Sequence, residues 1–263
     1  MGRPIPFCWY ELMTSDATAA TAFYKSVVGW TIHPPQAGSA MDYRMIEVAD
    51  GAMVGGVLGL APDMIAAGAT TCWIPYLAVA DIDASLLAIE ADGGTTCMPR
   101  TDIAEGSFAL MTDPQGAGFY LMRPKPPVDR PEATSTAFKA DGVGHGRWNE
   151  LATSDPAAAK AFYARHFGFE FNNAMPMGEA GEYAFIDFDG TALGAIMPIL
   201  DPARKPSWLV YFGVASVMAA KAAIEQSGGT VLMGPHEVPG GDWIVVATDP
   251  QGASFGVVGP KGE

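Results

Sequence analysis

Two glutamates that could act as general bases lie in the same short string, which the chain uses twice. The string reads WYEL at residues 9–12 and WNEL at residues 148–151, so that Glu11 and Glu150 occupy matching positions. A carboxylate in an apolar setting holds its proton more tightly than one in water, which suits proton transfer near neutral pH. The string therefore indicates either a catalytic carboxylate or a buried polar group that needs a hydrogen-bond partner.

The elements that must position these glutamates are repeated along with them. Residues 9–30 match residues 148–169 at 12 of 22 positions. A second string, TDPQGA, occurs at residues 112–117 and again at residues 248–253. The chain is therefore an internal repeat of two homologous halves, and its 263 residues with 49% hydrophobic content are enough for two cores.

Each half begins with the same predicted succession of elements. The alternating Trp-x-Glu segment predicts a strand, and Ser15 or Asp16 can cap a helix of about 12 residues that stops at Gly29. A loop then leads to a hairpin at residues 50–51, where Asp-Gly favours a tight turn. This succession is a βαβββ module. Similar signals predict four modules, two in each half.

The boundary between the halves is predicted from composition. Residues 124–142 contain four prolines and few apolar side chains, which is typical of a linker. We therefore predict one domain at residues 1–123 and a second at residues 143–263.

Charge and cysteine content exclude several classes of protein. Fifteen basic and 29 acidic residues give a net charge of −14, which repels nucleic acid and anionic membranes. The three cysteines have no spacing typical of a disulfide framework or a thiolate zinc site. With no apolar run of about 20 residues and no apolar signal region, a cytoplasmic protein is expected. It should be a monomer with internal pseudo-symmetry or a homodimer.

The order of these motifs resembles the vicinal-oxygen-chelate superfamily, which includes glyoxalases, bleomycin-resistance proteins and extradiol dioxygenases. The likeness rests on four βαβββ modules in two pairs, each pair closing on an Asp-Pro-Gln-Gly turn. It covers nearly the whole chain apart from the linker. The resemblance implies an α+β fold in which paired modules form an open barrel, with helices on its outside and one cleft in each domain.

The resemblance also implies where a metal would bind. Metalloenzymes of the family place a His in each first strand and a Glu in each last strand around one divalent cation. The His positions correspond here to Trp9, Ile74, Trp148 and Leu209. The last strands, expected at residues 52–58, 118–122, 191–198 and 254–259, contain no carboxylate. Because these side chains offer no metal donor, we expect neither a metal nor an organic cofactor.

The family places the lost ligand position on the cleft side of the strand, so Glu11 and Glu150 should face the clefts. The same count along the second and fourth modules gives Tyr76 and Tyr211. Each cleft is thus expected to hold one Glu and one Tyr, and these four residues are the candidate catalytic groups. The alternative is structural, since a buried Glu and Tyr could simply satisfy each other's hydrogen bonds.

Apolar side chains around these positions are candidates for ligand contact. The residues predicted to line the clefts are Trp9, Met13, Ile74, Trp148, Leu209 and Tyr120. Strand alternation places Trp73 and Trp208 on the opposite, helix-facing side, where they should pack in the core. Loops at residues 33–42 and 172–182 could form the rims of the clefts.

Three functions are compatible with these features. The first is a metal-independent protein that binds a small apolar or aromatic metabolite or drug-like molecule, one cleft per domain. The second is a metal-free lyase, isomerase or hydroxylase-like enzyme with a cleft Glu as general base. The third, a divalent-metal glyoxalase or dioxygenase, is disfavoured by the missing ligands. No glycine-rich phosphate loop or nucleophile elbow points to another chemistry.

Overall fold

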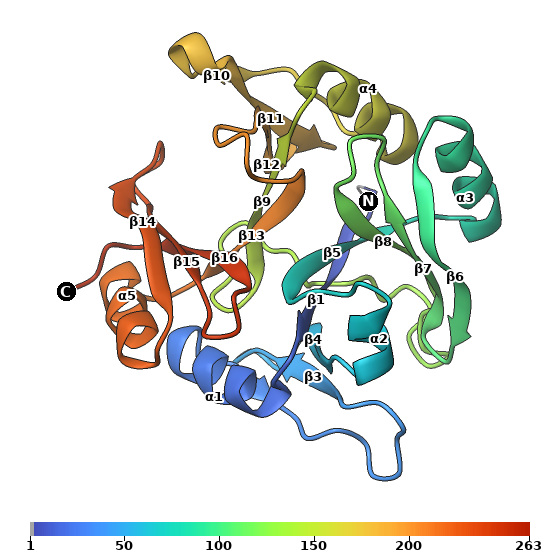
Figure 1. Cartoon of the computed structure of the whole chain (residues 1–263), viewed down its shortest axis with the longest axis horizontal. Coiled ribbons are helices and arrows are strands. Elements are labelled where there is room, and N and C mark those ends of the chain that lie inside the picture. The colour runs from blue at the N-terminus through green and yellow to red at the C-terminus, as the bar shows by residue number, and fades with distance from the viewer. Residues whose placement is uncertain (1–2) are drawn as a thin grey trace. The chain divides into compact units, whose positions relative to one another are not determined.

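The computed structural model describes residues 3–263 and contains two mixed eight-stranded sheets (Figure 1). The strand order is β2-β3-β4-β1-β5-β8-β7-β6 in the first sheet and β10-β11-β12-β9-β13-β16-β15-β14 in the second. Each sheet is built from two βαβββ modules, which confirms the predicted fold class. Within the described residues, no helix has the length and apolar character needed to cross a membrane.

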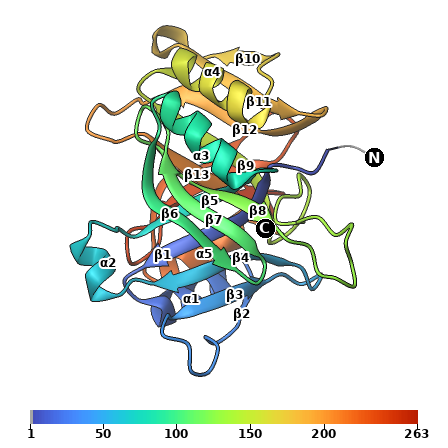
Figure 2. The same ribbon diagram turned by 90° about the vertical axis from the view of Figure 1, so that its right-hand side faces the viewer.

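The first sheet contains the first two modules. The first module consists of β1 (Phe7–Thr14), α1 (Ala17–Val27), β2 (Thr31–Ile32), β3 (Tyr43–Glu47) and β4 (Met53–Gly59). The second, after the short helix α2 (Pro62–Ala66), consists of β5 (Cys72–Ala78), α3 (Ile82–Ala91), β6 (Thr95–Ile103), β7 (Gly106–Thr112) and β8 (Gly118–Pro124). Figure 2 shows the long hairpin of β6 and β7 with α3 beside it.

The second sheet repeats the plan with the third and fourth modules. The third consists of β9 (Gly146–Thr153), α4 (Pro156–Phe167), β10 (Ala174–Pro176), the short helix η1 (Gly178–Ala180), β11 (Glu182–Phe188) and β12 (Thr191–Pro198). The fourth consists of β13 (Ser207–Gly213), α5 (Val217–Gln226), β14 (Thr230–Glu237), β15 (Trp243–Thr248) and β16 (Ser254–Gly259).

The four long helices begin where the sequence predicts, because each has a capping side chain. Asp16, Asp81, Asp155 and Ser216 precede α1, α3, α4 and α5, and the side chain of each accepts a hydrogen bond from one or two backbone amides of the first turn. Such caps stabilise a helix end by about 1 kcal/mol each. Gly168, in the left-handed conformation, ends α4.

The predicted connections contain more structure than their composition indicates. The link between the first two modules forms α2, with Pro62 in its first turn, where proline leaves no amide unsatisfied. The predicted rim loop at 172–182 includes β10 and η1. In the predicted linker, residues 124–136 are exposed, whereas Ala137 and Phe138 are buried and Phe138 forms a β-bridge with Gly146.

The chain divides into two compact units, named here for their places in the sequence. The middle unit contains residues up to 8, residues 75–135 and residues 148–209, and so most of the second and third modules. The terminal unit contains residues 9–74, 136–147 and 210–263, and so most of the first and fourth modules. Figure 1 shows α3 beside α4 in the middle unit, and α1 beside α5 in the terminal unit.

The core of the terminal unit contains a hydrogen-bonded chain of three side chains. The indole of Trp73 on β5 donates to the hydroxyl of Tyr24 on α1 at 2.9 Å, and that hydroxyl donates to Asp249 at 3.1 Å. The other oxygen of Asp249 accepts the amides of Gln251 and Ala253. The repeated Asp-Pro-Gln-Gly turn is therefore the anchor for a helix that lies 225 residues away in sequence.

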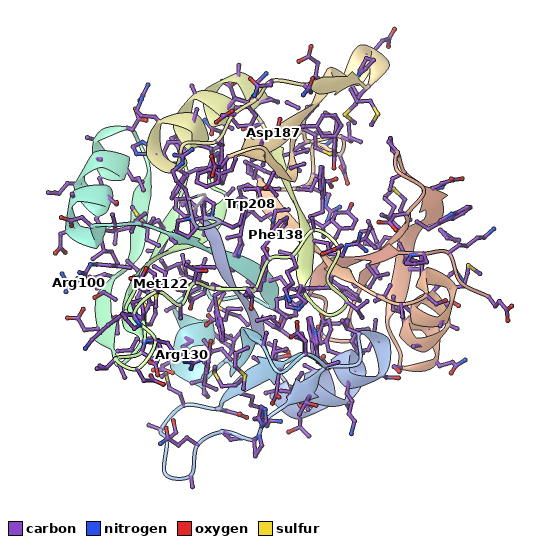
Figure 3. All side chains as sticks on the ribbon, turned by 180° about the vertical axis from the view of Figure 1, so that it is seen from behind. Arg100, Met122, Arg130, Phe138, Asp187 and Trp208 are labelled. Carbon is purple, nitrogen blue, oxygen red and sulfur yellow. The ribbon has the colours of Figure 1, made fainter. Side chains whose placement is uncertain are left out.

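The middle unit contains the same arrangement. Trp208 on β13 donates to Tyr163 on α4 at 3.2 Å, and Tyr163 donates to Asp113 at 3.1 Å. In Figure 3, Trp208 lies among densely packed side chains. Because Trp73 and Trp208 each donate to a helix tyrosine, their predicted helix-facing, core position is confirmed. Burial raises the pKa of both tyrosines and of both aspartates.

Candidate functional site

A cluster of Trp148, Glu150 and Tyr183 lies on the third module. Trp148 and Glu150 are two residues apart on β9, so their side chains share one face of the sheet. Tyr183 comes from β11, on the far side of β12. The Trp148 indole donates to the Tyr183 hydroxyl at 2.7 Å, and this hydroxyl donates to Oε2 of Glu150 at 2.8 Å. The phenol thus joins the tryptophan to the carboxylate.

Phe185 completes the surroundings of this third-module cluster. Its ring packs edge-on against Trp148, with centroids 6.0 Å apart, and against Tyr183, with centroids 5.8 Å apart. All four side chains are half-buried. Three aromatic rings and one carboxylate are therefore held together by contacts within one module, and part of each remains accessible.

The first module holds the matching cluster of Trp9, Glu11 and Tyr43. The Trp9 indole donates to the Tyr43 hydroxyl at 2.9 Å, with Tyr43 on β3 and Trp9 on β1. Gly56 of β4 lies opposite Glu11, and a Cβ at Gly56 would come within 2.2 Å of the Tyr43 oxygen. The glycine therefore lets the phenol lie directly against the strand.

The two clusters differ in how much of the carboxylate can be reached. Glu11 is only 3% exposed, whereas Glu150 is half-buried. Met13, which is buried, follows Glu11 on the same face, and the smaller Ala152 takes that place beside Glu150. Gly56 is likewise replaced by Ala195, which lies opposite Glu150. The repeat thus conserves the polar groups but changes their neighbours.

The two predicted catalytic tyrosines lie on the modules that follow these clusters. Tyr76 of β5 is 6% exposed, and its ring stacks on Tyr120 of β8 with centroids 4.2 Å apart. Tyr211 of β13 is 3% exposed and lies against Gly256, where a Cβ would come within 2.1 Å of its ring. Glu11 belongs to the terminal unit and Tyr76 to the middle unit. Glu150 belongs to the middle unit and Tyr211 to the terminal unit. The two Glu–Tyr pairs therefore stay predictions.

The side chains predicted to contact a ligand fall into two groups. Trp9, Trp148 and Leu209 are half-buried, so part of each remains accessible. Met13, Ile74 and Tyr120 are buried, each less than one-tenth exposed. Tyr43 and Tyr183 are not among the predicted site residues. Their signal was present, because the two tyrosines lie in matching strands and are 140 residues apart, close to the 139-residue offset between Trp9 and Trp148.

The side chains at the family's metal positions do not fit a divalent cation. The indole nitrogens of Trp9 and Trp148 carry hydrogens that they donate to Tyr43 and Tyr183, and an indole N–H has no lone pair for a metal. Ile74 and Leu209 carry no donor atom. Among residues 3–263, no group of three or more His, Cys, Asp or Glu side chains is arranged to hold a metal ion.

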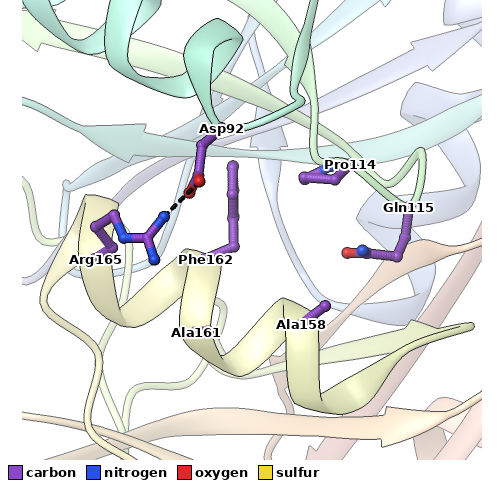
Figure 4. Close-up of a pocket in the computed structure, with 7 residues that line it drawn as sticks. All are labelled: Asp92, Pro114, Gln115, Ala158, Ala161, Phe162 and Arg165. Carbon is purple, nitrogen blue, oxygen red and sulfur yellow. Dashed lines mark hydrogen bonds and ion pairs between the residues drawn. The ribbon is translucent and has the colours of Figure 1, made fainter.

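Two surface cavities lie away from the clusters. One, of about 240 Å³, lies between α4, the end of α3 and the turn between β7 and β8 (Figure 4). In it Gln115 points across toward Ala158 and Phe162, and Arg165 pairs with Asp92. The other, of about 390 Å³, includes residues 40–42 of the predicted rim loop together with the start of α1. Neither cavity is lined by a Trp–Tyr–Glu residue.

The three cysteine thiols should differ in reactivity, because two of them are withdrawn from solvent and the third is exposed. Burial raises the pKa of Cys8 to about 12 and that of Cys72 to about 11, and the negative charge of Glu11 adds to the effect on Cys72. Cys97 is exposed. Since the thiolate is the reactive form, a rise of two pKa units lowers the reactive fraction about 100-fold.

With a dithionitrobenzoate reagent at about pH 8, native protein should therefore show one fast thiol and two that react at least about 100-fold more slowly. Cys97→Ser should remove the fast phase, and denaturant should make all remaining thiols react quickly. A fast phase that survives Cys97→Ser would contradict the burial of Cys8 and Cys72.

Family models and full-length relatives place both halves of the chain in one family. Residues 142–257 match the model of the Glyoxalase/Bleomycin resistance protein/Dioxygenase superfamily, and residues 10–122 match that of a glyoxalase-like domain. The protein named "Putative glyoxylase CFP32" of Mycobacterium tuberculosis is 31% identical over 254 residues, which is 96% of this chain and 94% of that protein. The anthracycline biosynthesis protein DnrV of Streptomyces peucetius is 28% identical over 264 residues, or 95% and 91% of the two chains.

Solved structures show the same fold at low sequence identity. The 2,3-dioxygenase LapB from Pseudomonas sp. KL28 has a TM-score of 0.65 and 14% identity, covering 98% of this chain and 93% of its own. The Mn(II)-bound glyoxalase from Novosphingobium aromaticivorans has a TM-score of 0.63 and 16% identity, covering 100% and 84%. The fold, the two matching family models and the full-length relatives agree: the chain belongs to the glyoxalase/bleomycin-resistance/dioxygenase superfamily, the vicinal-oxygen-chelate fold.

Proposed function

We propose that the protein binds small planar aromatic molecules, without a divalent metal, at its Trp–Tyr–Glu clusters. The observation that carries this proposal is that two of the family's metal-binding positions hold tryptophans, Trp9 and Trp148, whose indole N–H groups donate to tyrosine hydroxyls. Partly exposed aromatic rings favour flat apolar ligands, because they bury large areas and stack in preferred geometries. A carboxylate beside the rings supplies a polar contact that orients the ligand.

The relatives support a flat, polycyclic kind of ligand. DnrV and a second relative, DauV of Streptomyces sp. strain C5, are named for anthracycline biosynthesis. Anthracyclines are fused-ring aromatic molecules, so proteins acting in their biosynthesis meet planar ligands of this chemical class. The half-buried frame of Trp148, Tyr183 and Phe185 suits a ligand of that shape.

The proposal is tested by titrating the protein with 2-naphthol, a neutral two-ring probe, and following tryptophan fluorescence or heat. Saturable binding is expected, and Trp148→Ala should weaken it about 10-fold through lost aromatic contact. Trp243→Ala is the matched control. Trp243, on β15, is also half-buried, but its ring packs against Lys261 and is not part of a Trp–Tyr–Glu cluster. Absence of saturable binding, or equal effects of the two substitutions, would refute the proposal.

A metal-free enzyme is the second candidate, and the Tyr183–Glu150 hydrogen bond favours it. A carboxylate that accepts a hydrogen bond from a phenol is placed to accept or return a proton. A lyase, isomerase or hydroxylase-like reaction could then use Glu150, or Glu11 in the first half, as general base. For such an enzyme, Glu150→Gln should lower turnover by about two to four orders of magnitude, with ligand affinity little changed.

A further inference from the structure

The cavity between α4, the end of α3 and the turn between β7 and β8 contains a polar atom that lacks a hydrogen-bond partner. Oε1 of Gln115 is buried and accepts no hydrogen bond from any group among residues 3–263. The carboxamide points across the cavity toward Ala158 and Phe162 (Figure 4). A buried acceptor without a donor is unfavourable, so a ligand that brings a donor relieves this cost when it binds. The residues that line the cavity all belong to the middle unit.

An ion pair lines the same cavity. Nη1 of Arg165 donates to Oδ1 of Asp92, and Nε2 of His166 lies 2.9 Å from Oδ2. Hydrogen bonding by His166, and then by Arg165, lowers the pKa of Asp92, so the carboxylate is ionised and offsets the charge of the guanidinium. The Arg165 side chain is 61% exposed, and a guanidinium has five N–H donors, so donors remain accessible to the oxygen of a ligand.

From these groups we infer that the cavity is a second binding site, for small neutral molecules that carry an amide, such as a lactam or a carboxamide. The N–H of the ligand donates to Oε1 of Gln115, which can turn toward it because the last torsion of a glutamine side chain is soft. The carbonyl oxygen of the ligand accepts from Arg165. The volume of about 240 Å³ is below that of sites for drug-sized molecules, so the ligand has few heavy atoms. The inference is independent of the proposed function, which concerns the Trp–Tyr–Glu clusters.

The repeat supplies an internal control for this site. Oε1 of Gln251, in the matching turn of the terminal unit, is also buried and accepts no hydrogen bond within the described part of the chain. Ser26 and Ser227 take the places of Arg165 and Asp92 there. The terminal unit therefore has the glutamine without the ion pair, and we assign the amide site to the middle unit.

The test compares two probes of nearly equal shape by NMR of ¹⁵N-labelled protein. ε-Caprolactam is a seven-membered lactam, and cycloheptanone is a ketone of the same ring size that lacks the N–H. Caprolactam should give saturable chemical-shift changes at the amides of residues 113–117 and of α4. Cycloheptanone should bind at least about 5-fold more weakly, the difference that one hydrogen bond makes. Neither probe is aromatic, so the result is separate from binding at the Trp–Tyr–Glu clusters.

Three variants assign the contacts. Gln115→Met removes the acceptor at similar volume, so it should weaken caprolactam binding at least about 5-fold and remove the preference over cycloheptanone. Arg165→Ser introduces the side chain of the terminal unit and should weaken both probes, because both carry a carbonyl oxygen. Gln251→Met is the matched control and should leave both affinities unchanged. Circular dichroism of each variant confirms that it is folded.

Four results would overturn the inference. Caprolactam that causes no saturable shifts at residues 113–117 and α4 would show that the cavity is not a binding site. Equal binding of the two probes, or a preference that survives in Gln115→Met, would exclude the hydrogen bond to Gln115. An equal loss of affinity in Gln251→Met would place the effect outside this cavity. A failure of 2-naphthol to bind leaves all of these outcomes unchanged, because it concerns the Trp–Tyr–Glu clusters.

Discussion

Replacing Asp249 with alanine should lower the free energy of unfolding by about 3 to 5 kcal/mol, one of the largest effects expected for a single substitution in this chain. The carboxylate is 3% exposed and accepts hydrogen bonds from the Tyr24 hydroxyl and from the amides of Gln251 and Ala253. Alanine leaves these three donors, of which the Tyr24 hydroxyl and the Ala253 amide are in buried hydrogen bonds, without an acceptor. Each unsatisfied buried donor costs about 1 to 3 kcal/mol, partly relieved if water enters.

Urea unfolding followed by circular dichroism measures the effect, provided the slope of the transition is unchanged. Asp249→Asn is the control, because it keeps the shape and one acceptor oxygen; it should cost about 1 kcal/mol. Asp113 in the middle unit makes the same kind of contacts, accepting from Tyr163 and from the amides of its own turn. Asp113→Ala should therefore have an effect of the same size. A loss below about 1 kcal/mol for both alanine variants would mean that the Trp–Tyr–Asp chains contribute little to stability.

Stability should also fall steeply at alkaline pH. Burial is the main cause that raises the pKa of Tyr24 and Tyr163 well above 10.0, and the nearby charges of Asp249 and Asp113 raise it further. A group whose pKa is higher in the folded protein contributes stability that is complete below its unfolded pKa and is lost as the pH rises beyond it. The unfolded chain ionises these phenols from about pH 10, while the folded protein keeps them protonated.

Each such group contributes a slope of about 1.4 kcal/mol per pH unit, so the two phenols together approach about 2.7 kcal/mol per pH unit above pH 10. Cys72 and Cys8, with folded pKa values of about 11 and about 12 against 9.0, add to the loss from pH 9 upward. Urea midpoints measured between about pH 8 and pH 11 test this. The double variant Tyr24→Phe with Tyr163→Phe should be less stable at neutral pH, but its free energy of unfolding should fall less steeply with pH above pH 10. An equally steep fall in that variant would exclude the two phenols as its source.

Much of the fold was predictable because local signals and the repeat agree. Alternation, capping residues such as Asp16 and Asp155, and the Asp50–Gly51 turn place strands and helices close to their observed bounds. The helix α2 was not predicted, because a five-residue helix depends on its surroundings more than on composition. Nor does a repeat say which modules pack together: Tyr24 and Asp249 meet although they belong to different halves.

The candidate site was predictable only in part. The repeat located Trp9, Glu11, Trp148 and Glu150, because these residues recur at one offset. Tyr43 and Tyr183 went unrecognised because they reach across an intervening strand, which requires knowledge of the strand order. The different burial of Glu11 and Glu150 depends on neighbours such as Met13 and Ala152, whose effect becomes clear only after packing is known.

Metal independence of ligand binding is tested most directly by titrating one sample with 2-naphthol in two states. The first is protein dialysed against a strong chelator and verified as metal-free by elemental analysis, and the second is the same protein after addition of Mn²⁺, Ni²⁺ or Zn²⁺. Equal affinity in both states, with no stoichiometric metal retained after desalting, is the expected result, because Trp9, Ile74, Trp148 and Leu209 supply no ligand atoms. Binding that appears only with added metal, together with one retained metal equivalent per chain, would contradict it.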